Sequence, residues 1–548
     1  MKKAFLILFI VLAVIAVAAA VVFGTGLLTF GEDTGAAASP PLETEEPAAS
    51  ITPPSPSPGP TRAPAVLGDN RFSLRHNPDV SLNPITGTDP DNLRLGSLLY
   101  ESLFALDERF TAVPVLCESY HTDNGKTFRF TIYEDIAMSD GTTMDAYDVA
   151  YSLNRARESS RLSARLSDIT SVTVFERLTV EVTLGHVNYR LPTLLDVPII
   201  KYGSTGTVPP GSGPYRYDAT GEEPMLVKSI EYRNSSLLPV DVIYLESCTD
   251  AELGERFTSQ RIDLYEDDPM GGYRVIVPRD HETRYYDTTT LQFLGLNDRV
   301  EAMRDPAFRR AIAAAADVRG LAAEIMGGHA VAAPLALSPR HALYNAAWEP
   351  KRTGSAFAEL SGILAEMGFE DTDSDRYLEY MREDGSHSPF TLTFIVNDDN
   401  EFKVAAAERI ADVISRVGLD IELKVLPWDE FEAVLKSGGF DMYYGEVRLS
   451  ADFNLSPLLL PGGSLDYGGM GGEKYRALLA DFSAAESEKA QTDAARALCY
   501  AVEDDAPFIP LLYKQFAVHT GRNVARGLRP TQSGIFTNIT QWQLIIDN

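Results

Sequence analysis

The stretch SDGTTMDAYDVAYSL, residues 139–153, constrains the fold most, because it combines a tight turn with the start of an amphipathic helix. Its Asp-Gly pair favours a turn, and Thr142 or Thr143 can cap the helix that follows. Asp145 and Asp148 place negative charge near the positive end of that helix. Four side chains recur with helical spacing and predict its buried face: Ala146, Val149, Ala150 and Leu153.

Other segments also predict alternating strands and helices. Just before the turn, Phe128, Phe130 and Ile132 alternate with polar residues, as in a half-buried strand. Residues 389–426 have the pattern of a strand, a helix and a second strand, which is the βαβ unit of a parallel sheet. Asp305 and Pro306 suit the cap and first position of another helix. The chain is therefore predicted to be α/β.

The composition limits the number of domains and the class of partner. A chain of 548 residues exceeds what one hydrophobic core usually organises, so two or more lobes are expected. Its net charge of −30 argues against nucleic acid and anionic membrane surfaces as partners. The three cysteines, Cys117, Cys248 and Cys499, lie far apart, and we expect buried packing residues, with one disulfide left open as an alternative.

The N-terminal residues predict an anchor and a spacer. Two lysines precede an uncharged, mostly apolar run over residues 4–30, which is long enough to span a bilayer. We therefore expect residues 1–31 to be an uncleaved transmembrane signal anchor that holds the rest of the chain at the extracytoplasmic face of the cell membrane. A cleaved signal is the alternative. Residues 32–66 contain nine prolines among small and polar residues, and this composition is typical of a solvated linker.

Six segments in a fixed order resemble one protein family. They include the 139–153 stretch, Tyr100 to Phe104, the GSGPY sequence at residues 211–215, RDPAFRRAIAAAAD at residues 304–317, and PFIPL at residues 507–511. Their order resembles the extracytoplasmic solute-binding proteins of peptide/nickel ABC transporters, of the oligopeptide and dipeptide-binding type. The resemblance runs from about residue 82 to 512. Many relatives are lipoproteins attached through a cysteine just after the signal. In this sequence no cysteine occurs before Cys117, so lipid anchoring is not expected.

The resemblance implies an α/β, two-lobed periplasmic-binding-protein-like fold of type II, with an inserted subdomain and a hinge between the lobes. Lobe I is then expected to combine residues 67–105, 189–288 and 510–548. The inserted subdomain is expected at residues 106–188 and lobe II at residues 289–509. The chain would cross the hinge twice, so that the lobes close on a ligand as rigid bodies.

The resemblance also points to ligand-binding residues. The sequence Ala451 to Asn454 resembles a cleft-lining stretch whose aspartate pairs with the amino terminus of a peptide, so Asp452 is the candidate for that role. A solvated aspartate or an internal pair with Arg448 is the alternative. Arg448 could receive a ligand carboxylate. Tyr443, Tyr444 and Phe453 could present aromatic faces to the side chains of a ligand. Asn297 is the last candidate, because it lies where relatives cross between the lobes. Leu449 stands where relatives have a tryptophan.

No catalytic or metal-binding motif is found in the sequence, and no cofactor or catalytic residue is expected. We expect a monomeric, extracellular peptide-binding protein that delivers ligand to an ABC permease and its ATPase subunits and performs no chemistry. Two alternatives stay open. The same fold could bind a sugar, opine, haem or metal chelate, or the chain could be an anchored sensor without transport.

Overall fold

The computed structural model describes residues 71–272, 275, 277, 280–351, 356–381, 385–521 and 524–544. The predicted anchor at residues 1–31 and the predicted linker at residues 32–66 lie outside the described residues. Within the described ranges, no helix has both the length and the apolar character needed to cross a membrane.

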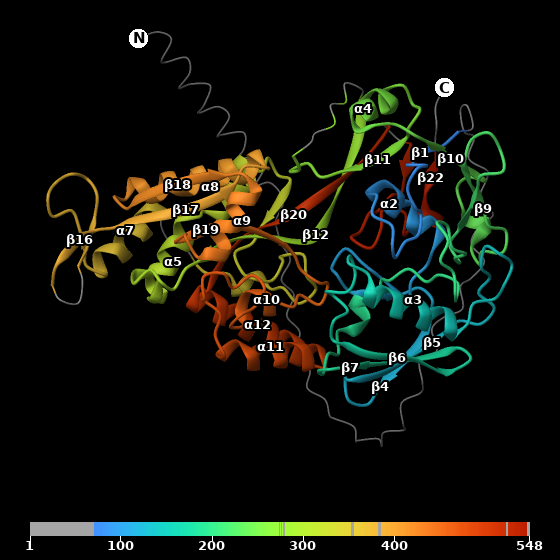
Figure 1. Ribbon diagram of the computed structural model, residues 1–548, viewed down its shortest axis with the longest axis horizontal. Coiled ribbons are helices and arrows are strands. Elements are labelled where there is room, and N and C mark those ends of the chain that lie inside the picture. Colours follow the sequence, from blue (N-terminus) through green and yellow to red (C-terminus); the bar gives the residue numbers. More distant parts are fainter. Residues whose placement is uncertain are drawn as a thin grey trace, which may run out of the picture. The chain divides into compact units, whose positions relative to one another are not determined.

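One mixed sheet of eleven strands joins segments from both halves of the described chain (Figure 1). The strand order is β18-β17-β19-β12-β20-β11-β1-β10-β9-β8, and β13 pairs with β20 outside that path. In that order the bounds are Asp420–Leu426, Thr391–Asn397, Met442–Arg448, His281–Leu296, Phe508–Gly521, Leu264–Asp267, Ser73–Arg75, Val242–Glu246, Met225–Lys228, Tyr215–Asp218 and, for β13, Ala330–Ala332.

A separate sheet of four antiparallel strands lies beneath α3 (Ala146–Glu158) (Figure 1). Its order is β4 (Cys117–Thr122), β5 (Thr127–Ile132), β7 (Thr179–Leu184) and β6 (Ile169–Glu176). Ala146, Val149, Ala150 and Leu153 are all buried, which confirms the predicted face of the helix. These strands and α3 fall within residues 106–188, where an inserted subdomain is expected, and that boundary stays a prediction.

The cap of α3 differs from the prediction. The Asp145 carboxylate accepts the Tyr147 N–H at 2.8 Å, and the Asp145 N–H donates to Asp148 at 2.8 Å. Thr142 instead donates its hydroxyl to Asp140 at 2.6 Å within the turn. Because the helix begins at Ala146, Asp145 is the adjacent residue with a side-chain acceptor, and the prediction of a threonine cap was wrong.

The other half of the chain contains the predicted βαβ unit. β17 and β18 are parallel neighbours, and α8 (Glu401–Arg416) between them packs on both strands. Asp305 caps α5 (Pro306–Ala315) by accepting the Ala307 N–H at 2.8 Å, as predicted. The remaining helices here are α6 (Val318–Gly320), α7 (Ala356–Glu366), α9 (Trp428–Ser437), α10 (Ser456–Leu459), α11 (Lys474–Ala484) and α12 (Glu488–Asp505).

Short elements complete the described chain. The helices are α2 (Pro90–Leu99) and α4 (Asp250–Thr258), with short helical turns η1 (Leu191–Leu194), η2 (Ser235–Leu237), η3 (Ala302–Arg304), η4 (Leu321–Ile325), η5 (Ala346–Trp348) and η6 (Ile539–Gln541). The strands are β2 (Phe104–Leu106), β3 (Ala112–Pro114), β14 (Phe369–Glu370), β15 (Glu379–Met381), β16 (His387–Pro389), β21 (Ala525–Arg526) and β22 (Gln543–Leu544).

Separate hydrophobic cores define two lobes. The first core gathers buried residues from between Phe72 and Leu264 together with residues from Val518 to Leu544. Two further cores are built almost entirely from residues between Leu291 and Tyr513. Cys117 lies in the first core and Cys499 in the third, and both thiols are free, so their predicted packing role is confirmed.

The long strands β12 and β20 connect the two lobes. Their ladder changes register between Asp287 and Leu291, where Asp287 faces Gln515 and Leu291 faces Tyr513. Between these two pairs β12 has more residues than β20, so the ladder contains a bulge in β12. The bulge interrupts the connection between the lobes at Thr288 to Thr290.

Candidate ligand-binding cavity

A cavity of about 1260 Å³ opens beside the bulge. Its walls include residues of α2, β2 and β3, the segments at residues 161–165, 196–198 and 232–234, β12 from Tyr286 to Thr290, and residues 529–541. Drug-sized ligands usually occupy pockets of about 300 to 1,000 Å³. The cavity is therefore large enough for a ligand with several groups.

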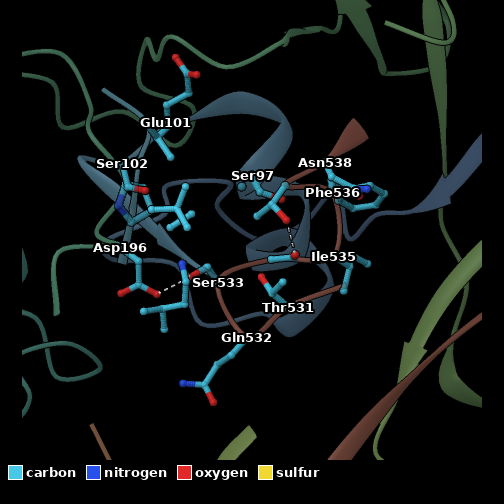
Figure 2. Close-up of a pocket in the computed structure, with 18 of the residues that line it drawn as sticks. Ser97, Glu101, Ser102, Asp196, Thr531, Gln532, Ser533, Ile535, Phe536 and Asn538 are labelled. Carbon is cyan, nitrogen blue, oxygen red and sulfur yellow. Dashed lines mark hydrogen bonds between the residues drawn. The ribbon is translucent and has the colours of Figure 1, made fainter. Parts of the chain in front are cut away.

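Neutral polar side chains form one wall, and hydrogen bonds hold them in place (Figure 2). Ser533 donates its hydroxyl to Asp196 at 3.0 Å and accepts the Leu106 N–H at 2.7 Å. Gln532 accepts the Thr289 N–H at 2.6 Å through its Oε1 atom. The loop at residues 531–534 is therefore tied both to β2 and to the bulge of β12.

Two arginines of the wall are neutralised by acidic neighbours. Arg94 forms an ion pair with Glu266, and Tyr286 donates its hydroxyl to the same carboxylate at 2.5 Å. Burial and the charge of Glu266 raise the pKa of Tyr286 well above its ordinary value, so the phenol stays protonated. Arg233 contacts both oxygens of the buried Glu101, at 2.6 and 2.8 Å.

A second group of three arginines, Arg161, Arg165 and Arg448, has a single carboxylate partner within the described ranges. Arg165 pairs with Asp196 at 2.6 Å. Nearby, Arg161 donates to the Pro84 carbonyl oxygen, and the guanidinium of Arg448 makes no hydrogen bond or ion pair with any described residue. Burial lowers the pKa of Arg161, and the positive charges of Arg165 and Arg448 lower it further. This part of the cavity therefore carries excess positive charge.

Among the candidate residues from the sequence, Arg448 lines the cavity. It ends β19, where Thr290 of β12 is its partner in the ladder. Its exposed side chain is available to a ligand. The other five candidates are not part of the cavity wall.

Asp452 and Phe453 lie in a buried contact between the lobes. Asp452 is 7% exposed, and its two carboxylate oxygens accept from Asn188 at 3.0 Å and Ser450 at 2.5 Å. Phe453 is 1% exposed and packs edge-on against His341, with ring centroids 4.7 Å apart. Arg190 also donates to the Asp452 carbonyl oxygen at 3.1 Å. We call Asn188, Arg190, His341 and Asp452 the interlobe latch.

The remaining three candidates lie inside the second lobe. Tyr443 donates its hydroxyl to the Leu465 carbonyl at 2.9 Å, and Tyr444 donates to Gln292 at 2.8 Å. Asn297 donates to the Phe440 carbonyl at 2.6 Å. All three side chains are buried, so these contacts give each of them a packing role, and ligand contact stays a prediction.

Most of the cavity wall was not predicted from the sequence. Arg161 and Arg165 follow α3 at a spacing of four residues, which in a helix would place them on one side. That spacing could have been noticed, although it is also common on solvated surfaces. Gln532 and Ser533 stand in a Thr-Gln-Ser-Gly sequence that reads as an ordinary turn.

The described residues bring three acidic groups together at a position away from the cavity. Asp371, Asp373 and Asp375 are exposed, and their carboxylate oxygens lie within 4.8 Å of one another. Asp371 already accepts backbone N–H groups from Ser374 at 2.7 Å and Arg376 at 3.1 Å. These contacts stabilise the loop itself.

Comparison with known proteins identifies relatives of this fold. The glutathione-binding protein GsiB of Escherichia coli K12 is 29% identical over 153 residues, which are 25% of this chain and 30% of GsiB. The match thus spans less than a third of that relative. The structure of MppA, a periplasmic murein tripeptide binding protein in its unliganded open form, is similar with a TM-score of 0.71 and 16% identity, covering 88% of this chain and 99% of MppA.

The structure of the oligopeptide-binding protein AppA from Bacillus subtilis, in complex with a nonapeptide, covers 88% of this chain and 99% of its own, with a TM-score of 0.59 and 17% identity. Such identities show a shared fold. The two-lobed, periplasmic-binding-protein-like fold predicted from the sequence is thereby confirmed. The profile of the family "Bacterial extracellular solute-binding proteins, family 5 Middle" matches residues 111–461, more than half of the chain. The chain therefore belongs to the family 5 extracellular solute-binding proteins.

Proposed function

We propose that this protein captures short peptides outside the cytoplasm and delivers them to an ABC permease and its ATPase subunits. The observation that carries the proposal is the cavity of about 1260 Å³, which lies beside the strands that join the lobes of a family 5 fold. Relatives that bind glutathione, a murein tripeptide and a nonapeptide support a peptide as ligand. The protein binds and releases its solute without chemistry on it.

Capture works through closure of the lobes. The strands β12 and β20 carry the chain between the lobes, and the bulge at Thr288 to Thr290 is where their ladder is interrupted. A few residues at such a point can absorb the dihedral changes of a hinge while each core stays rigid. A bound peptide then shifts the population towards the closed form, which the permease distinguishes from the open form.

The proposed location follows from the N-terminal sequence. Residues 1–31 act as a signal anchor in the cell membrane, and residues 32–66 act as a solvated spacer between the membrane and the lobes. The lobes then act as a monomer at the outer face of the membrane.

The proposal is tested by measuring peptide binding to the purified full-length chain. Native mass spectrometry identifies ligands that copurify, and calorimetry with a panel of two- to nine-residue peptides measures affinity. A bound peptide present at about 100 times its Kd should stabilise the protein by about 2.7 kcal/mol in a thermal unfolding experiment. Absence of both binding and stabilisation across the whole panel would reject peptides as the solute.

Asp452 as the partner of the peptide's amino terminus is tested separately. Asp452→Ala is expected to lower the affinity for a peptide with a free amino terminus by roughly tenfold, because a charge-assisted hydrogen bond is lost. The N-acetylated form of the same peptide should bind parent and variant equally. Asp481→Ala, on the exposed side of α11, is the control. If both forms of the peptide bind Asp452→Ala as they bind the parent, Asp452 serves the interlobe latch alone.

A further inference from the structure

The cavity has a charge opposite to that of the chain. The whole protein carries a net charge of −30. The cavity wall instead contains seven arginines and five carboxylates. An excess of positive side chains in a hollow of an acidic protein concentrates anions there, because the surrounding walls focus the field. The positive charge of the wall therefore favours anionic solutes in the cavity.

Arg161 and Arg448 are two of the wall arginines without a carboxylate partner in the described part of the chain. The Arg94, Arg165 and Arg233 guanidinium groups each have a carboxylate partner in the wall. Asp196 is the one carboxylate whose charge acts on Arg161, and it already pairs with Arg165 at 2.6 Å and accepts from Ser533 at 3.0 Å. Arg161 has a carbonyl partner, and Arg448 has no partner among the described residues.

Arg161 and Arg448 stand on different lobes. Leu162, next to Arg161, belongs to the first core, and Leu449, next to Arg448, belongs to the third. The two like charges are close enough for Arg448 to lower the pKa of Arg161, although burial is the largest cause of that shift. Their repulsion opposes approach of the lobes around an empty cavity, whereas an anion between them attracts both.

We propose that Arg161 and Arg448, beside the Arg165–Asp196 pair, form an anion site that selects peptides with an acidic residue at the carboxyl end. This inference rests on the proposed peptide-binding function and names its substrate class. A terminal glutamate or aspartate supplies two carboxylates, one for the guanidinium group of Arg161 and one for that of Arg448. Guanidinium groups bind carboxylates through paired, charge-assisted hydrogen bonds. Because the site joins two lobes, the same contacts favour the closed form.

The test compares the tripeptides Ala-Ala-Glu and Ala-Ala-Gln, which differ in one charge, by calorimetry on the full-length chain. The parent should bind Ala-Ala-Glu about tenfold more tightly. Arg161→Gln and Arg448→Gln should each reduce this ratio to about threefold or less. The parent's ratio should also fall as sodium chloride is raised, since exposed charges are screened.

Two matched variants control for charge alone. Arg155→Gln and Arg177→Gln each change an exposed arginine that lies outside the cavity wall. Both should keep the tenfold ratio. Three results would each overturn the anion site. The parent could bind the two tripeptides with equal affinity, Arg161→Gln and Arg448→Gln could both leave the affinity ratio unchanged, or all four variants could lower the ratio equally. These results leave peptide binding intact. If no peptide of the wider panel binds, the proposed function fails and the anion site fails with it.

Discussion

Replacing Arg190 by leucine is expected to lower the free energy of unfolding by roughly 3 to 5 kcal/mol. Arg190 is only 8% exposed, and it is the centre of the interlobe latch. Its Nε atom donates to the Asp452 carbonyl at 3.1 Å, its Nη2 atom lies 2.9 Å from Nε2 of His341, and its guanidinium lies 4.5 Å from the centre of the Phe482 ring.

The cost comes from the groups that Arg190 leaves behind. Burial lowers the pKa of Arg190 to about 10, and the charge of Asp452 opposes this shift, so the guanidinium remains charged at neutral pH. Without it, the Asp452 carboxylate stays buried with neutral partners, and a buried charge that loses its counter-charge is strongly destabilising. Leucine fills part of the space of the arginine side chain. The loss in the free energy of unfolding therefore comes from the lost polar contacts more than from a cavity.

The measurement is urea unfolding followed by tryptophan fluorescence. Arg155→Leu, on the exposed surface of α3, should stay within about 0.5 kcal/mol of the parent. The double variant Arg190→Leu with Asp452→Asn should recover part of the loss, because it removes the unpaired carboxylate as well. A single variant as stable as the parent would mean that desolvation of Arg190 cancels its contacts.

Local signals in the sequence predicted the secondary structure well. The alternation at Phe128 to Ile132 and the helical spacing from Ala146 to Leu153 each depend on residues close in the chain, and both elements form. The same is true of Asp305 at the start of α5. The threonine cap was wrong because two acceptors competed for one helix end, and spacing alone does not decide between them.

The cavity was much harder to predict, because its wall joins residues distant in the sequence. Ser533 meets Asp196, and Gln532 meets Thr289, through folding of the terminal loop onto β12. No local pattern encodes such pairs. Arg448 was found through its position beside a family-like stretch. Asp452, four residues later, is instead engaged by Asn188, a residue that the sequence gives no reason to connect with it.

Lowering the pH from 7 to 4 is expected to destabilise the parent by about 3 kcal/mol through His519 alone. His519 lies on β20 between β11 and β12. Its Nδ1 atom lies 3.0 Å from the Thr283 hydroxyl, its ring stacks on Tyr265 with centroids 4.7 Å apart, and Asp267 lies 3.9 Å from its Nε2 atom. Burial, followed by the charges of His281 and His329, lowers its pKa from 6.5 to about 4.

The direction of the effect follows from where the proton binds first. Between pH 6.5 and 4 the unfolded chain protonates this imidazole and the folded chain does not, so folding becomes less favourable as the pH falls. The contribution is complete above pH 6.5 and is lost on the way down to about pH 4. One pKa unit corresponds to about 1.4 kcal/mol, which gives the expected size.

Urea unfolding at a series of pH values from 7.5 to 4.5 measures this dependence in the parent and in His519→Asn. Asparagine places a polar atom near the Thr283 hydroxyl and does not titrate, so the variant should lose stability less steeply below pH 6.5. His121→Asn changes an exposed histidine that pairs with Asp123 and should keep the slope of the parent. Identical slopes for His519→Asn and the parent would show that other groups account for any acid sensitivity of the first lobe.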